Sequence, residues 1–234
     1  MIAELEFGKV DVAVHSGSAQ LSPAEVAADL NRVYRRLRLT SNLAPAAFDL
    51  DIDAADPAKF DREYRAVCKL ARQLTVATLT MPAAPSGSDF DAEAKRLRHL
   101  VDIAGGDGLV LTVVNRIGTL TELPETAVKL CQRVPGLGLT LDPSHYICGP
   151  NQNNCYDMVF PYVKHVHLRD SGRTPDKMQV RVGQGELEYS KMVTQLERCR
   201  YDRLLSVEIM DQPNLPFVME SEVRKLKYLL ESLA

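Results

Sequence analysis

The stretch LGLTLDPSH, residues 137–145, decides the fold that we predict for this chain. Side chains alternate between the two faces of a strand, so the three leucines share one face and Asp142 lies on the other, with Gly138 and Thr140. An open sheet covered by helices on both faces favours apolar residues on both sides of its central strands. A closed barrel accounts better for a polar inner face, because such barrels hold their active sites at the carboxyl ends of the strands.

Seven apolar runs of strand length alternate with segments of helical period, which is the pattern of βα units around a parallel sheet. The predicted strands are residues 9–15, 43–50, 74–81, 109–115, 137–142, 163–168 and 204–210. Helices with readable starts are expected over residues 22–37, 56–74 and 90–106. No linker divides the 234 residues, so we predict a single α/β domain over residues 1–234, a (β/α)8-type TIM barrel. A doubly wound fold is the competing possibility, but no G-x-G-x-x-G follows the first strand.

The composition favours a small-molecule partner. Lys and Arg number 28 against 31 Asp and Glu, so the chain lacks the uncompensated basic patch that nucleic-acid binding requires. The five cysteines are scattered and form no C-x-x-C pair, which predicts reduced thiols rather than disulfides or a cysteine zinc site. The first residues are acidic and no apolar run approaches the length of a membrane span, so we expect a cytoplasmic protein.

Polar side chains gather where the last predicted strands end. They are Asp142, His145, His165, His167, Arg169, Asp170 and Glu208. Carboxylates and imidazoles that converge from several strands are suited to a divalent cation. Each also has a structural interpretation: an Asp before Pro starts a turn, and a histidine is often a satisfied core residue. A carboxylate within the apolar run SVEIM is harder to explain without a cation or another partner.

Further candidates lie outside these strand ends. His15 ends the first predicted strand, and we assign it to substrate binding. The loop RDSGRTPDKMQVRVGQGELEY, residues 169–189, carries Arg173 and Arg181 and a G-x-G turn. Such a loop can hold a phosphate or carboxylate on its arginines, or it can be a solvated loop in which Asp170 and Asp176 are internal counter-charges.

Four motifs in a fixed order carry a family resemblance. They are L-x-L-D-x-x-H (139–145), V-K-H-V-H-L-R-D (163–170), G-x-G-E (183–186) and V-E (207–208) after a Tyr-Asp turn. With this order and spacing the chain resembles the xylose-isomerase-like barrel superfamily, the sugar phosphate isomerase and epimerase group that also includes inosose dehydratases and endonuclease-IV-type enzymes. The resemblance is strongest over residues 90–212. It implies a TIM barrel and does not name the substrate.

The resemblance also implies a metal site. In that family one metal is held by a Glu, an Asp, a His and a second Glu, and the glutamates serve as acid and base. Asp142 matches the Asp, His167 the His, and Glu208 the last Glu, which predicts Mn²⁺, Co²⁺, Zn²⁺ or Mg²⁺ as cofactor. His145 matches a histidine that contacts the substrate and is a second catalytic candidate, and Arg173 lies where ketose epimerases place a substrate-binding arginine.

Two departures from the family pattern bear on the mechanism. The first metal-binding Glu should end the strand 109–115, and Val114 stands there instead. Family members usually begin with a strand and helix before the counterpart of residues 9–15, and here only MIAELEFG precedes it. This short piece either supplies a poor first strand or leaves a seven-stranded barrel with an open seam, which a helix or a homo-oligomeric partner would cover.

These observations give three hypotheses of function. The first is a metal-dependent sugar isomerase, epimerase or lyase that acts on a small polyol, ketose or sugar phosphate through an enediol. The second is a non-catalytic binding or regulatory barrel, motivated by Val114. The third, a DNA-repair endonuclease, needs further histidine ligands and a basic groove, and the chain is short of both.

Overall fold

The computed structural model describes residues 3–18, 20–39, 43–211 and 215–233. Within these ranges seven strands form one sheet. They are β1 (Lys9–His15), β2 (Ala44–Asp51), β3 (Thr78–Pro82), β4 (Val110–Val114), β5 (Gly138–Leu141), β6 (Val163–Leu168) and β7 (Leu205–Val207). The α-helices are α1 (Pro23–Ala28), α2 (Leu30–Arg38), α3 (Pro57–Gln73), α4 (Phe90–Gly106), α5 (Pro124–Arg133), α6 (Pro143–Cys148), α7 (Tyr189–Arg198) and α8 (Met219–Leu233). Short 3₁₀ helices are η1 (Ala3–Leu5), η2 (Asp157–Tyr162) and η3 (Pro175–Lys177).

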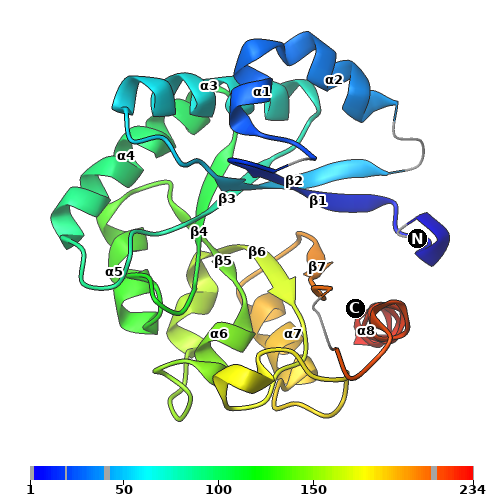
Figure 1. Cartoon of the computed structure of the whole chain (residues 1–234). Coiled ribbons are helices and arrows are strands. Elements are labelled where there is room, and N and C mark those ends of the chain that lie inside the picture. Colours follow the sequence, from blue (N-terminus) through cyan, green and yellow to red (C-terminus); the bar gives the residue numbers. More distant parts are fainter. Residues whose placement is uncertain (1–2, 19, 40–42, 212–214, 234) are drawn as a thin grey trace. The chain divides into compact units, whose positions relative to one another are not determined.

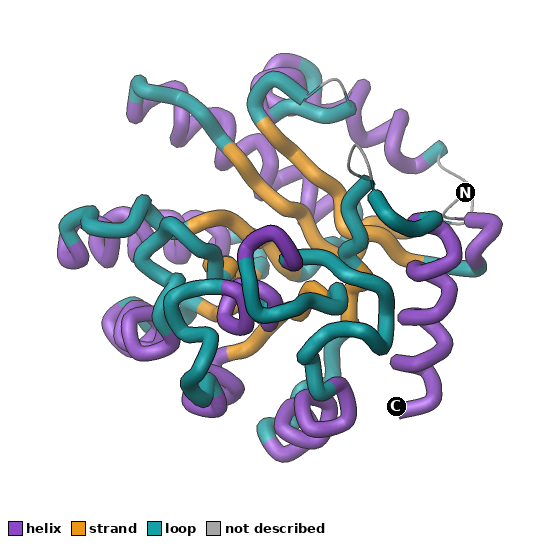
Figure 2. Tube along the Cα trace, turned by 60° about the horizontal axis from the view of Figure 1, so that its bottom comes forward, coloured by secondary structure: helices purple, strands orange, loops and turns teal. Residues whose placement is uncertain are grey.

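The strand order confirms the predicted α/β barrel topology. The strands are hydrogen-bonded in the consecutive order β1 to β7, whereas a doubly wound sheet reverses its order at a switch point. β1 and β2, β2 and β3, β5 and β6, and β6 and β7 pair in parallel. Figure 2 shows the alternation of strand and helix along the chain. In the part of the N-terminus that is described, residues 3–5 form a 3₁₀ turn and the first strand is β1.

The chain forms two compact units. Unit 1 comprises Met1–Pro82, Ala94–Thr112 and Val134–Leu137, and unit 2 comprises Ala83–Glu93, Val113–Arg133 and Gly138–Ala234. No α-helix among the described residues is long and apolar enough to cross a membrane.

In unit 1 the helices α1, α2 and α3 pack on one another beside β1 and β2 (Figure 1). The hydroxyl of Ser22 accepts the backbone N–H of Glu25, and the carboxylate of Asp56 accepts that of Ala58, so these two residues cap α1 and α3 at the predicted helix starts. The single helix predicted over residues 22–37 is wrong. The chain breaks at Asp29, which has φ −151° and whose carboxylate caps α2 by accepting the backbone N–H of Arg32 at 2.9 Å.

In unit 2 the strand β5 is buried on both faces. All residues from Gly138 to Leu141 are buried, and Asp142 follows as the first residue of the turn into α6. The leucines pack in the hydrophobic core, while Thr140 and Asp142 are buried polar residues on the opposite face. Burying polar groups requires partners for them, and the partners of Asp142 define the candidate site.

The break at Asp29 gives a stability prediction. Asp29→Ala removes the α2 cap and is expected to lower the free energy of unfolding by about 1 kcal/mol. Urea denaturation followed by circular dichroism measures this change. Asp53→Ala, an exposed aspartate that caps no helix, is the matched control, and equal losses in the two variants would contradict the capping role.

Candidate active site

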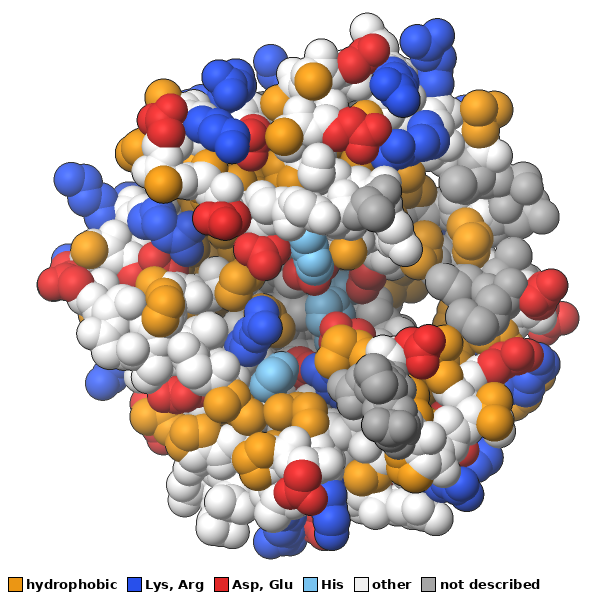
Figure 3. Space-filling view, viewed as in Figure 1, with side chains coloured by type: hydrophobic (Ala, Val, Ile, Leu, Met, Phe, Trp, Pro, Cys, Tyr) orange, Lys and Arg blue, Asp and Glu red, His pale blue; other side chains and the backbone are white. Residues whose placement is uncertain are grey.

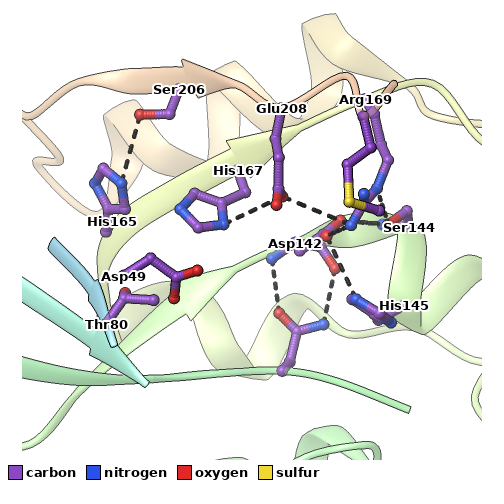
Figure 4. A network of polar contacts seen from close by, with 12 residues as sticks. Asp49, Thr80, Asp142, Ser144, His145, His165, His167, Arg169, Ser206 and Glu208 are labelled. Carbon is purple, nitrogen blue, oxygen red and sulfur yellow. Dashed lines mark hydrogen bonds and ion pairs between the residues drawn. The ribbon is translucent and has the colours of Figure 1, made fainter. Parts of the chain in front are cut away.

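Four predicted site residues lie together in unit 2. Contacts join His167, Glu208, Arg169, Asp142 and His145 in this order (Figure 4). His167 Nδ1 lies 3.3 Å from Glu208 Oε2, which lies 3.6 Å from Arg169 Nη2. Arg169 Nη2 is ion-paired with Asp142 Oδ2, and His145 Nε2 lies 3.5 Å from the same oxygen. The candidate ligands Asp142, His167 and Glu208 are therefore connected through an arginine.

Asp142 serves as the N-cap of α6. Its Oδ1 accepts the backbone N–H of Ser144 at 3.0 Å and also the Ser144 hydroxyl. Asn115 fixes the Asp142 backbone, because its Nδ2 donates to the Asp142 carbonyl at 2.8 Å and its Oδ1 accepts the Asp142 N–H at 2.7 Å. Asp142 thus starts a turn through Oδ1, as the structural interpretation expected. Its Oδ2 contacts Arg169 and His145. Asn115 was not among the predicted site residues, and its buried position after a strand was the available signal.

Arg169 directly follows β6 and carries the positive charge of the cluster. Its side chain is 4% exposed, and its Nε donates to Ser144 Oγ at 3.0 Å. Asp142, Ser144 and Arg169 therefore form a closed ring of hydrogen bonds. The sequence placed Arg169 at the strand end with His165 and His167, and also at the start of an anion-binding or solvated loop. The structure buries it against a carboxylate of its own chain.

The ion pair controls the ionisation of both partners. Burial would raise the pKa of Asp142, but the charge of Arg169, together with His145 and the Ser144 hydrogen bond, outweighs burial and holds this pKa below its usual value. Burial would lower the pKa of Arg169, but Asp142 and Glu208 raise it overall. Both groups are therefore charged at neutral pH.

His145 is held as a neutral imidazole. Its Nδ1 accepts the backbone N–H of Ile117 at 3.4 Å, which assigns the proton to Nε2, facing Asp142. Burial lowers the pKa of His145; Asp142 opposes this effect and Arg169 adds to it. A neutral His145 can donate from Nε2 without adding a second positive charge beside Arg169.

Glu208 is the accessible carboxylate of the cluster. Its side chain is 35% exposed, whereas those of Asp142 and His167 are 1% and 9% exposed. Its backbone N–H donates to Leu168 O at 2.8 Å, which fixes it at the end of β7 beside β6. The rings of His165 and His167 meet edge to face with centroids 5.0 Å apart, and Ser206 Oγ lies 3.4 Å from His165 Nε2.

Val114 ends β4, where the family resemblance implies the first Glu. Its side chain is apolar, and its carbonyl oxygen accepts the Thr121 hydroxyl at 2.7 Å. The position therefore offers no carboxylate for a metal or for acid–base chemistry.

The loop 169–189 is organised by Asp170 rather than by an external anion. Asp170 is buried, and its Oδ2 accepts the backbone N–H groups of Gly183 at 2.7 Å and Gly185 at 3.1 Å. A Cβ at Gly185 would lie 2.1 Å from Asp170 Oδ1, so only glycine fits there. The amides of the G-x-G turn thus hold a carboxylate of the protein itself.

The predicted substrate-binding residues contact other groups. Arg173 Nη2 donates to Glu186 Oε2 at 3.0 Å on the exposed loop, and Arg181 Nη2 donates to the Pro216 carbonyl at 2.9 Å. In unit 1, His15 Nε2 lies 3.1 Å from Asp49 Oδ2, with both side chains partly exposed. Their assignment to substrate binding stays a prediction.

A family model described as xylose isomerase-like TIM barrel matches residues 2–229. The chain belongs to this family. Among solved structures, a family member from Mycobacterium smegmatis in complex with magnesium has a TM-score of 0.76 and 18% identity, covering 100% of this chain and 87% of that one. A D-allulose 3-epimerase from Methylomonas sp. has a TM-score of 0.74 and 16% identity, covering 99% of this chain and 89% of that one.

A third similar structure is the apo form of a 3-keto-D-glucoside 4-epimerase from E. coli, with a TM-score of 0.70 and 15% identity, covering 99% of this chain and 91% of that one. At such identities the similarity establishes the shared fold alone. A search of curated protein sequences finds no significant match. The family assignment confirms the predicted resemblance.

The lowered pKa of His145 predicts a pH-dependent stability. Between the lowered folded-state pKa of His145 and its unfolded value near 6.5, the unfolded chain binds more protons than the folded chain. The neutral His145 therefore contributes fully to the free energy of unfolding above this range, and the contribution is lost as the pH falls through it. His145→Asn removes this contribution and should give a shallower decline below about pH 6.5. Urea denaturation at a series of pH values measures it, and parallel curves for wild type and variant would refute the neutral imidazole.

Asp170 supports a second prediction. Asp170→Ala leaves the amides of Gly183 and Gly185 without their acceptor and should lower the free energy of unfolding by about 1–3 kcal/mol. Hydrogen exchange measured by mass spectrometry should show faster exchange over residues 170–186. The exposed Asp176→Ala is the control on the same loop, and unchanged exchange in Asp170→Ala would show that the loop does not depend on this carboxylate.

Proposed function

We propose that this protein is a sugar isomerase- or epimerase-like enzyme that acts on a small polyol, ketose or sugar phosphate, with Glu208 as the catalytic base. One observation carries the proposal: an accessible carboxylate contacts an imidazole and a guanidinium inside a buried polar cluster. Membership of the xylose isomerase-like family and the epimerases among the similar structures support the sugar class.

The surface charge is consistent with a small substrate. On the face shown in Figure 3, acidic and basic side chains are interspersed, with no broad patch of one sign. A polyanion would need such a patch of positive charge.

The residues at the site suit proton transfer through an enediol. Glu208 would take the proton from the carbon next to the substrate carbonyl, and the electron pair would move to the carbonyl oxygen. His145 Nε2 or water would protonate this oxygen. Glu208 then returns its proton to the former carbonyl carbon, while the hydroxyl on the deprotonated carbon gives its proton back to His145 or water and becomes the new carbonyl. This converts an aldose to a ketose, and a single base on one face is sufficient for it. Epimerisation needs a donor on the opposite face, which Val114 does not provide, so aldose–ketose isomerisation is the favoured reaction.

The metal set implied by the family does not fit these residues as they lie. Asp142 Oδ1 accepts two hydrogen bonds from Ser144, and Oδ2 is ion-paired with Arg169. A divalent cation that joined Asp142 to Glu208 would lie close to the Arg169 guanidinium, and the two positive charges would repel each other. Metal dependence is therefore not part of this proposal, and the roles proposed above contain no step through a metal.

A second candidate is a non-catalytic sugar-binding barrel. Val114 favours it, because the two-carboxylate arrangement of the family is incomplete at this position. The accessible Glu208 favours the enzyme, since a binding role alone does not require an acid–base pair at the surface of the cluster.

Solvent exchange distinguishes these candidates. The full-length protein is incubated in D₂O with a panel of aldoses, ketoses and their phosphates, and proton NMR follows loss of the C–H signal next to the carbonyl. An isomerase exchanges this proton with at least one substrate even where product hardly accumulates. Glu208→Gln should lower the exchange rate at least about 100-fold, the lower range of a lost general base.

Glu197→Gln, an exposed glutamate on α7, is the matched control and should exchange at the wild-type rate. Exchange that persists in Glu208→Gln would exclude Glu208 as the base. Sugar binding without exchange in the wild type would favour the non-catalytic barrel.

A further inference from the structure

Arg169 is a member of the cluster that the proposed proton transfer does not use. Its guanidinium contacts Asp142 on one side and approaches Glu208 on the other, with Nη2 3.6 Å from Glu208 Oε2. Both carboxylates were predicted as metal ligands. The arginine therefore stands where a cation shared by these two ligands would bind.

Charge and burial explain why a cation is required there. Asp142 is completely enclosed, and an isolated carboxylate in such a place is costly unless a positive charge and hydrogen bonds balance it. Arg169 supplies both, since Nη2 pairs with Asp142 and Nε donates to Ser144, which in turn donates to Asp142. Arginine is suited to this role, because its guanidinium is always charged and has several donors in one plane.

We propose that Arg169 is the resident cation of this site and takes the place of a divalent metal between Asp142 and Glu208. The guanidinium neutralises the Asp142 carboxylate permanently, so the pair has no vacant coordination position. Removing the guanidinium leaves two neighbouring carboxylates and His167, which is a suitable set for Mn²⁺.

One hydrogen-bond donor of the guanidinium is unsatisfied. Arg169 Nη1 is buried and makes no hydrogen bond to the residues that the structure describes. An unmet buried donor is costly, so an oxygen of water or of the bound ligand is expected to accept from it. Because Asp142 already balances the charge of Arg169 and Glu208 adds a negative charge, a neutral carbonyl or hydroxyl oxygen suits Nη1 better than a phosphate or carboxylate.

Mn²⁺ binding tests the replacement directly. This inference concerns the site of the proposed function, but Mn²⁺ uptake does not depend on turnover, so the two can fail separately. The full chain, freed of metal with a chelator that is then removed, is titrated with Mn²⁺ while electron paramagnetic resonance follows the free ion. Arg169→Ala should bind about one more equivalent than wild type, the single cation that the three freed ligands can hold.

Further variants make the result specific. The added Mn²⁺ should disappear in Arg169→Ala/Asp142→Asn, and Arg169→Lys should not acquire it, because the ammonium keeps the positive charge. Arg198→Ala, which removes an exposed arginine on α7, should match wild type. The proposal is overturned if Arg169→Ala binds no more Mn²⁺ than wild type, or if Asp142→Asn alone removes Mn²⁺ that wild type binds.

Thermal unfolding is a second readout for a weakened variant. Arg169→Ala leaves Asp142 unpaired, so its Tm should fall without metal and recover with Mn²⁺ by more than the wild-type Tm changes. Equal Mn²⁺ effects on the two proteins would count against the proposal. If Arg169→Ala does not fold in either condition, Asp142→Asn decides: unchanged Mn²⁺ uptake supports the proposal and reduced uptake overturns it.

Discussion

The buried ion pair between Arg169 and Asp142 is the interaction on which the site depends. Two charges can be buried together only if most of their hydrogen-bonding positions are also met. The surrounding residues do this for Asp142 and for Arg169 Nε and Nη2. Ser144 bonds both partners, and Asn115 fixes the backbone of Asp142 through a pair of hydrogen bonds. Loss of either charged partner would leave the other uncompensated. The geometry of the cluster therefore follows from electrostatic balance, and Glu208 is the carboxylate that remains accessible.

Asp170, the next residue in the chain, is a buried charged group with a different kind of partner. Asp170 is buried like Arg169, but it is satisfied by the backbone amides of Gly183 and Gly185 instead of a side-chain cation. The dipeptide Arg169–Asp170 thus connects the end of β6 to two structures: the site through the arginine, and the following loop through the aspartate.

Much of the fold could be predicted, because strand and helix periods alternate along the chain and β1 and β6 have the predicted bounds. The gathering of Asp142, His145, His167 and Glu208 also followed from their places at strand ends. The role of Arg169 could not be predicted, since a charged residue after a strand has the same local signal whether it faces solvent or a buried carboxylate. Likewise, a continuous helical period over residues 22–37 concealed the break, because Asp29 is compatible with both a helix and a cap.

This chain belongs to the xylose isomerase-like family and has a site in which a guanidinium lies between two carboxylates that the family resemblance assigns to a metal. In such a site one carboxylate stays accessible while the chain itself supplies the cation. The most direct measurement is an anomalous-difference map from a crystal soaked in Mn²⁺. The account predicts the Arg169 guanidinium, and no anomalous peak, between Asp142 and Glu208. A peak within coordinating distance of both carboxylates, with the guanidinium displaced, would contradict it.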